Sequence, residues 1–128
     1  MKPAPFAYHR PDTVAEACDT LAYYGEDGKI LAGGQSLAAL LALRITHFEN
    51  LVDISMIDEL RGIEVRDQTV WVKAATTHAT VGRDPDVECA VPLLTRVTPH
   101  IGHFQIRNRG TLGGAVAHGD PAGEFPTV

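Results

Sequence analysis

Residues 107–126 read RNRGTLGGAVAHGDPAGEFP, and this stretch constrains the fold more than any other part of the chain. It holds five glycines within fourteen residues. Each glycine disfavours a regular helix or strand by about 0.5–1 kcal/mol relative to alanine, so we expect irregular, exposed backbone here. Without Cβ atoms at Gly113 and Gly114, a ligand can approach the peptide planes closely, and successive N–H groups can point into one concavity. The stretch therefore predicts contact with a phosphate-bearing molecule.

A shorter glycine segment, AGGQS, occupies residues 32–36. The short segment 29–32, which is apolar from Ile30 onward, predicts a buried strand that the glycine pair ends sharply, and Ser36 is expected to cap a helix over 37–43. Free N–H groups at a helix start, together with the macrodipole, favour a bound anion. An ordinary strand-to-helix turn fits the same residues. The segment lacks both the GK[ST] of a Walker loop and the spacing of the dinucleotide fingerprint. Two glycine segments together predict an extended ligand.

Composition limits the possible functions. The chain has 128 residues, which suffices for about one domain with its own core. Its net charge of -5, with scattered basic residues, argues against nucleic acid as the main partner. The two cysteines, Cys18 and Cys89, fit a reducing compartment and two buried thiols, and they cannot supply four thiolates to an iron–sulfur cluster. The N-terminus lacks a secretory pattern, and no apolar run reaches membrane-spanning length, so we expect a cytoplasmic protein without a membrane span.

The first half of the chain alternates helical and strand patterns. Thr13 and Glu16 have capping-box spacing for a helix that runs to Gly25, with Cys18 on its apolar face. Residues 51–54 predict a further short strand.

Beyond residue 60 a hairpin is expected, with strands over 63–66 and 70–75 around the turn residues Asp67 and Gln68. The packing side chains of this hairpin should be Val65, Val70 and Val72, with Trp71 on the opposite face. A short helical turn should follow over 79–83, and a helix should begin near Pro92. The inward side chains of that helix are expected to be Leu93, Leu94 and Val97.

Several polar residues admit two interpretations. Arg107 and Arg109 fit charge complementarity to a diphosphate, but equally a salt bridge or a subunit contact. Glu124 is placed to accept hydrogen bonds from ribose hydroxyls, whereas Asp120 reads as a cap or turn residue before Pro121. The six histidines are interpreted as structural or solvent-facing rather than as metal ligands, because a zinc site needs three or four convergent ligands.

Three motifs carry a family resemblance: AGGQSL at 32–37, ATTH at 75–78 and HIGHFQIRNRGTLGGAVAHGDPAGEFP at 100–126. They resemble the FAD-binding subunit of molybdenum-containing hydroxylases, the medium subunit of aerobic carbon monoxide dehydrogenase and its relatives. The resemblance implies an α+β FAD-binding domain of the vanillyl-alcohol-oxidase type with two subdomains, over about 1–55 and 56–128. Relatives continue past the equivalent of Val128, so the chain is expected to be C-terminally truncated, without the rest of the second subdomain and a C-terminal domain.

The resemblance also implies a cofactor site for FAD. Residues 30–37 would wrap the diphosphate, 111–115 would form a second clamp, Glu124 would contact the cofactor, and Ile101 would lie close to the flavin. The implied cofactor-binding residues are Ile30, Leu31, Ala32, Gly33, Gly34, Gln35, Ser36, Leu37, Ile101, Thr111, Leu112, Gly113, Gly114, Ala115 and Glu124. No catalytic acid or base and no metal ligand is expected on this chain. Valine at Gly34 or Gly113 is expected to block FAD while leaving the fold largely intact.

The function implied by the resemblance is electron transfer within a larger oxidoreductase. FAD on this subunit would receive electrons from iron–sulfur clusters on a small subunit, after a molybdopterin centre on a large subunit has oxidised the substrate. The expected assembly is a hetero-oligomer. Two alternatives stay open on the residues alone: a nonredox module that binds a nucleotide or shapes a subunit interface, and a stand-alone flavin oxidoreductase.

Overall fold

A computed structural model describes residues 2–128, and the chain divides into two compact units, Met1–Leu60 and Arg61–Val128. The family resemblance implies a division near residue 55. Within the described residues the longest helix has eleven residues, and none combines the length and apolar character that a membrane span needs.

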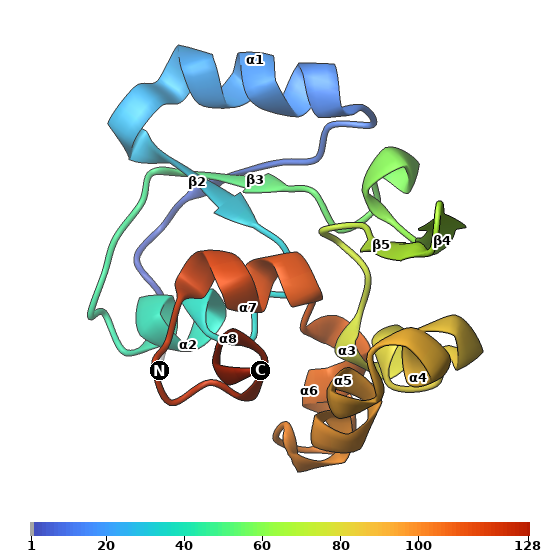
Figure 1. Ribbon diagram of the computed structural model, residues 1–128. Helices are drawn as coiled ribbons and strands as arrows, with labels where there is room; N and C mark the ends of the chain where they lie inside the picture. Colours follow the sequence, from blue (N-terminus) through green and yellow to red (C-terminus); the bar gives the residue numbers. More distant parts are fainter. Residues whose placement is uncertain (1) are drawn as a thin grey trace. The chain divides into compact units, whose positions relative to one another are not determined.

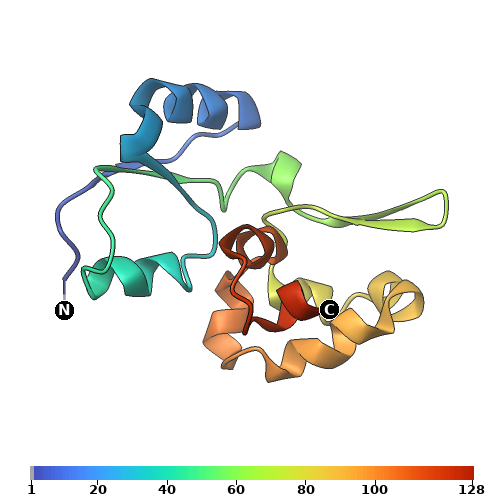
Figure 2. The same ribbon diagram turned by 60° about the vertical axis from the view of Figure 1, so that its left-hand side comes forward.

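The first unit is built on a parallel three-stranded sheet in the order β1-β3-β2. Its strands are β1 (Ala7–His9), β2 (Gly28–Leu31) and β3 (Asn50–Asp53), and its helices are α1 (Val14–Tyr24) and α2 (Leu37–Ala42). Short 3₁₀ turns follow α1 and β3, as η1 (Gly25–Asp27) and η2 (Asp58–Leu60). Parallel neighbours need crossover connections, which α1 and α2 supply on opposite sides of the sheet (Figures 1 and 2).

Helix α1 begins where the capping box predicted. The Thr13 hydroxyl accepts a hydrogen bond from the Glu16 N–H at 3.2 Å, and the Glu16 carboxylate accepts one from the Asp12 N–H at 2.9 Å. Ala17 on this helix packs in the core of the unit with Val52 of β3 and with Ile57, which follows β3 in the chain. The burial expected of the thiols is wrong, because Cys18 and Cys89 are both exposed free cysteines.

Strand β2 is not buried as expected. It pairs only with β3 and forms an edge of the sheet, so one row of its backbone groups has no strand partner. Lys29 is exposed, and Ile30 keeps 46% of its surface accessible. A run of apolar residues predicts burial only where both sides of a strand are covered, and here they are not.

The second unit begins with the expected hairpin, formed by β4 (Ile63–Arg66) and β5 (Thr69–Val72). Asp67 and Gln68 have φ values of 47° and 64°, the left-handed pair that a tight two-residue hairpin turn requires. The second strand ends at Val72 rather than at residue 75.

The two faces of this hairpin differ. Val70 and Val72 pack against the core of the unit, as expected. Val65, which pairs with Val70 across the hairpin, is exposed instead of packing there. Trp71 lies on the outer face, where the Arg66 guanidinium stands 5.6 Å from its ring centroid.

The rest of the second unit is helical. Its elements are α3 (His78–Val81), α4 (Pro85–Ala90), α5 (Pro92–Val97), η3 (Thr98–His100), α6 (Phe104–Arg109), α7 (Leu112–His118) and α8 (Glu124–Thr127). The buried cluster at its centre consists of Val81, Val87, Ile101 and Phe125. Leu94 and Val97 pack against this cluster, but Leu93 is exposed, contrary to expectation.

The glycine-rich stretch is far more regular than its composition suggested. Gly113 and Gly114 lie within the first turn of helix α7, which Thr111 caps by accepting a hydrogen bond from the Gly114 N–H at 3.1 Å. Gly119 ends the helix with a φ of 62°. The expectation of irregular backbone is therefore wrong between residues 112 and 118, because the cap and neighbouring backbone contacts offset the low helix propensity of glycine.

Candidate functional site

The first glycine segment forms a tight turn at the carboxyl end of β2. Gly34 has a φ of 71°, a conformation that favours glycine. The Gln35 side-chain amide donates a hydrogen bond to the Gly33 carbonyl oxygen at 2.9 Å, which fixes the turn from within. The Ala38 N–H then donates to the Gly34 carbonyl at 3.0 Å as α2 begins. The turn is therefore held by its own bonds.

The backbone N–H groups of residues 33–36 make this turn a candidate binding site. None of the four donates a hydrogen bond to another residue in the part of the chain that the structure describes. Gly33 is buried, and an unpaired N–H in a buried residue is rare in folded proteins. Four successive free donors fit a group rich in acceptor oxygens, such as a diphosphate.

Helix α2 adds less to this site than the sequence suggested. It spans six residues, and the Ser36 side chain makes no capping hydrogen bond, contrary to expectation. Ser36 itself has helical dihedral angles, whereas a capping serine usually has an extended backbone. The peptide groups of the turn, rather than a long helix dipole, are thus what this unit offers an anion.

The second glycine segment differs from the first in one decisive respect. Every N–H group from Leu112 to Ala115 already donates within the protein. The acceptors, in chain order, are the Thr76 carbonyl at 3.0 Å, the Ala74 carbonyl at 3.0 Å, the Thr111 hydroxyl at 3.1 Å and the Thr111 carbonyl at 3.0 Å. The expectation that consecutive amides here point into one concavity is therefore wrong.

Gly113 is a glycine because another part of the backbone lies against it. A Cβ built at this position would stand 2.6 Å from the Ala74 carbonyl oxygen and 2.7 Å from the Ala74 Cα. Contacts below 3.0 Å to backbone cannot be relieved by moving a side chain. The missing side chain thus allows two chain segments to pack, and the space beside it is not open to a ligand.

His78, in the ATTH motif, joins these segments. Its side chain is 6% exposed, and its Nε2 lies 2.9 Å from the Thr111 carbonyl oxygen. Its Nδ1 is buried without a hydrogen-bond partner among the described residues. Burial lowers the pKa of His78 below its ordinary value, although the hydrogen bond to Thr111 and the charge of Glu124 act in the opposite direction. The ring is therefore neutral at pH 7.

The lowered pKa of His78 predicts how stability depends on pH. The unfolded chain takes up this proton near pH 6.5 and the folded chain only at lower pH, so the free energy of unfolding should fall as the pH drops below about 6.5. One such proton contributes a slope of at most about 1.4 kcal/mol per pH unit. Urea unfolding at pH 7.5 and 5.5 measures this loss of unfolding free energy. The loss should shrink in His78→Gln and persist in His118→Gln, whose parent residue is exposed.

The other polar residues singled out in the sequence have different roles in the structure. One Arg107 guanidinium nitrogen donates to the carbonyl oxygens of Ile101 and Gly102 at 3.0 and 2.9 Å, so this side chain stabilises a loop. Arg109 is exposed. The Asp120 carboxylate accepts a hydrogen bond from the Ala122 N–H at 2.9 Å, which confirms its interpretation as a turn residue. Glu124 is half-buried at the first position of α8.

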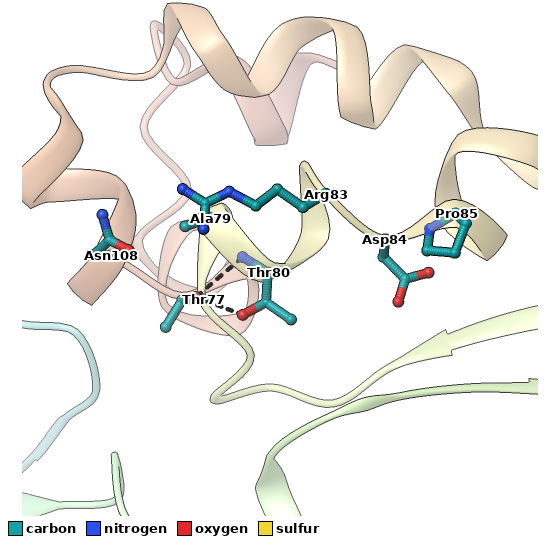
Figure 3. A pocket seen from close by; sticks show the side chains of 7 residues that line it. All are labelled: Thr77, Ala79, Thr80, Arg83, Asp84, Pro85 and Asn108. Atoms are coloured by element: carbon teal, nitrogen blue, oxygen red, sulfur yellow. Dashed lines mark hydrogen bonds between the residues drawn. The ribbon is translucent and has the colours of Figure 1, made fainter.

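A pocket of about 340 Å³ lies elsewhere on the second unit (Figure 3). It is lined by Thr77, Ala79, Thr80, Arg83, Asp84, Pro85 and Asn108. The Thr77 and Thr80 hydroxyl oxygens lie 2.9 Å apart and share a hydrogen bond (Figure 3). None of these residues was expected to bind a ligand, although Thr77 lies in the ATTH motif and Asn108 in the motif over residues 100–126. Within residues 2–128 no group of three histidine, cysteine or acidic side chains is placed to hold a metal ion.

Comparison with known proteins adds a further finding. A family model described as the FAD binding domain in molybdopterin dehydrogenase matches residues 4–128. The chain is 42% identical over 128 residues to the carbon monoxide dehydrogenase medium chain of Hydrogenophaga pseudoflava, covering 100% of this chain and 45% of that protein. It is 44% identical to the 6-hydroxypseudooxynicotine dehydrogenase complex subunit alpha of Paenarthrobacter nicotinovorans, covering 100% of this chain and 43% of that protein.

Solved structures of two such enzymes contain chains with the same fold as this one. A chain of the Hydrogenophaga pseudoflava carbon monoxide dehydrogenase that lacks the Mo-pyranopterin moiety matches with a TM-score of 0.96 and 44% identity, over 98% of this chain and 44% of that one. Quinoline 2-oxidoreductase from Pseudomonas putida 86 matches with a TM-score of 0.94 and 41% identity, over 98% and 44%. The expected α+β fold is thereby confirmed. The chain spans less than half the length of the curated relatives it matches.

Proposed function

Because the chain belongs to the family of FAD-binding domains in molybdopterin dehydrogenases, we propose that it binds FAD as part of an electron-transfer subunit of a molybdenum-containing hydroxylase or dehydrogenase. This chain is similar over its own whole length to part of a medium chain of carbon monoxide dehydrogenase, and this similarity supports the proposal. The backbone N–H groups of residues 33–36, which have no acceptor among the described residues, support it as well. The bound flavin would supply the redox chemistry by accepting and releasing electrons. The chain itself would hold and orient the cofactor.

The first glycine segment is proposed to hold the diphosphate. The free N–H groups of residues 33–36 would donate to its oxygens, and Gly34, with its φ of 71°, would allow the backbone of the turn that carries them. Ile30, Leu31, Ala32 and Leu37 flank this turn and would cover the cofactor with apolar surface. Desolvation by these side chains would strengthen each amide-to-oxygen hydrogen bond.

The second segment is proposed to contact the same cofactor by a different means. Since the amides of residues 112–115 are paired, the contact would come from the outer surface of the α7 start rather than from its N–H groups. The Glu124 carboxylate would accept hydrogen bonds from hydroxyl groups of the cofactor. Ile101 is buried in the core of its unit, so it would meet the flavin only through the small part of its surface that remains exposed.

Partner subunits are part of this proposal. The chain has two cysteines, and an iron–sulfur cluster needs four thiolates or equivalent ligands, so the clusters would lie on a small subunit. A molybdopterin centre would lie on a large subunit, in a hetero-oligomer located in the cytoplasm. The free thiols of Cys18 and Cys89 are compatible with that reducing compartment. Identifying the subunits that copurify with the chain tests the assembly.

The proposal predicts a yellow protein. Purified with its copurifying subunits, it should show flavin absorbance, acid release should yield FAD rather than FMN, and added FAD should raise the melting temperature of a cofactor-stripped sample. A colourless protein whose melting temperature does not respond to FAD would contradict the proposal. That result would favour a nonredox module, in which the paired amides of residues 112–115 only maintain the fold.

A further inference from the structure

The carboxyl ends of the three parallel strands lie at one edge of the sheet in the first unit. The turn at residues 33–36 follows β2 at this edge, and Asp53 is the last residue of β3. Asp53 stands beside Leu31 in the strand register, and the Ile54 N–H donates to the Leu31 carbonyl oxygen at 3.0 Å. Ligands of open parallel sheets bind outside the carboxyl ends of the strands. An acidic side chain therefore borders the proposed diphosphate site.

The Asp53 side chain lies on the same face of the sheet as this turn. Residues paired in parallel register share a face, so Leu31 and Asp53 do. Val52 points to the other face, where it packs with Ala17 of α1, and α2 lies on the opposite side of the sheet from α1 (Figures 1 and 2). The turn that leads into α2 contacts the Leu31 side chain, because a Cβ built at Gly34 would stand 3.2 Å from the Leu31 Cδ1 atom.

Two hydrogen bonds orient the half-buried Asp53 carboxylate. The hydroxyl of Tyr8, on β1, donates to Asp53 Oδ2, and the Ser55 N–H donates to Oδ1 at 2.8 Å. Burial raises the pKa of Asp53, but the bonds from Tyr8 and Ser55 and the charge of Arg10 outweigh it and lower this pKa below its ordinary value. Asp53 is therefore ionised at pH 7. A carboxylate has about four lone-pair positions, so these partners leave capacity for a donor on a ligand.

The groups of FAD that flank its diphosphate can supply such a donor. They are the hydroxyls of the ribose on one side and of the ribityl chain on the other. A carboxylate repels phosphate oxygens, but it accepts hydrogen bonds from hydroxyls. In other dinucleotide sites an acidic residue binds ribose hydroxyls next to a diphosphate that backbone N–H groups hold.

We propose that Asp53 is a further cofactor-binding residue, which accepts a hydrogen bond from a sugar hydroxyl of FAD beside the diphosphate, and that Tyr8 is a positioning residue that orients its carboxylate. The inference rests on the proposed function, because that function assigns the turn at residues 33–36 to the diphosphate. The site thus extends from the turn after β2 to the end of β3, within the first unit.

The test measures FAD dissociation constants for the cofactor-stripped protein with its copurifying subunits. Asp53→Asn keeps the size of the side chain and removes its charge, so the constant should rise about tenfold, because hydrogen bonds to charged groups are the stronger ones. Tyr8→Phe removes only the hydroxyl, and the constant should rise roughly threefold. If Tyr8 acts through Asp53, Tyr8→Phe should change the constant of Asp53→Asn by less than about twofold. Independent effects of the two substitutions would contradict the role of Tyr8.

Glu49→Gln is the matched control. Glu49 is exposed and directly precedes β3, so this variant removes one negative charge at the amino end of the strand whose carboxyl end holds Asp53. It should bind FAD as the wild type does. The inference is overturned if Asp53→Asn binds FAD as tightly as the wild type, or more tightly because repulsion of the diphosphate is relieved. An equal loss in Glu49→Gln would also overturn it. If circular dichroism shows that Asp53→Asn does not fold, unchanged FAD affinity in Tyr8→Phe overturns it.

Competition between ADP and FAD identifies the sugar. ADP carries the ribose and a diphosphate but no ribityl chain. Equal losses of ADP and FAD affinity in Asp53→Asn support a bond to the ribose, and a loss of FAD affinity alone supports a bond to the ribityl chain. A wild type that does not bind FAD would contradict the proposed function. A wild type that binds FAD, with an Asp53→Asn variant that binds it equally well, would contradict this inference alone.

Discussion

Gly113→Val is expected to unfold the second unit rather than merely to block a ligand. The first added carbon would stand 2.6 Å from the Ala74 carbonyl oxygen, and the Gly113 N–H donates to that same oxygen at 3.0 Å. Overpacking typically destabilises a protein by about 1–3 kcal/mol, and a clash with backbone belongs at or above the upper end of that range. Urea unfolding followed by circular dichroism should show a loss of at least about 3 kcal/mol.

The control for Gly113→Val adds bulk to the exposed side of the same helix. Ala117→Val adds two carbon atoms to an exposed residue of α7, and it should change stability by less than about 0.5 kcal/mol. Loss of FAD binding in Gly113→Val should accompany loss of the fold. If the variant is as stable as the wild type and only FAD binding is lost, the Ala74 contact does not explain this glycine.

Substitutions at Gly34 are expected to reduce FAD affinity in the order Asn, Ala, Val, with Val the most damaging. The φ of 71° penalises an ordinary side chain by roughly 1–2 kcal/mol, is tolerated best by asparagine and is least compatible with a β-branched residue. A Cβ here would also stand 3.2 Å from the Leu31 Cδ1 atom. Relief of this strain would change the backbone of the turn and thereby move the N–H groups of residues 33–36.

The comparison of Gly34→Asn with Gly34→Val separates two physical causes. The two side chains are similar in size, so a ligand that simply needs empty space at Gly34 would be lost equally in both. If the backbone conformation is what matters, the dissociation constant for FAD should rise at least about tenfold in Gly34→Val, which corresponds to about 1.4 kcal/mol, and by clearly less in Gly34→Asn. Equal losses in the two variants would contradict the role assigned to the turn.

Local signals predicted several elements correctly because the interactions that form them are local. The Thr13 and Glu16 capping pair lies within one turn of helix, and the Asp67 and Gln68 turn needs only its own dihedral angles. Helix α4 was not predicted, because Pro85 closely follows the short helical turn expected over 79–83 and a proline usually marks the end of a helix. In the structure Pro85 is the first residue of the helix, where its missing N–H is not needed. The Asp84 carboxylate caps this helix by accepting hydrogen bonds from the N–H groups of Asp86 and Val87.

The errors arose where distant parts of the chain meet. Gly113 was interpreted as an approach for a ligand, yet Ala74, nearly forty residues earlier in the sequence, occupies that approach. Strand β2 was expected to be buried, but the sheet order, which no local pattern reveals, places it at an edge. His78 was interpreted, with the other histidines, as structural or solvent-facing, and the structure shows the structural role; its burial and its unpaired nitrogen could not be predicted, because they depend on where Thr111 and Phe125 pack.

The lack of charged side chains around the turn at residues 33–36 determines how ionic strength should affect the binding of an anionic cofactor. Residues 30–43 contain no charged side chain, so this part of the chain offers an anionic cofactor oriented dipoles and no formal countercharge. Dipoles at hydrogen-bonding distance are little affected by dissolved salt, whereas exposed charges about 10 Å apart are largely screened at 0.1 M ionic strength. The chain as a whole carries a net charge of -5. Ionic strength would therefore act mainly by weakening the long-range repulsion between two negatively charged molecules, and buffers of moderate salt would favour their encounter.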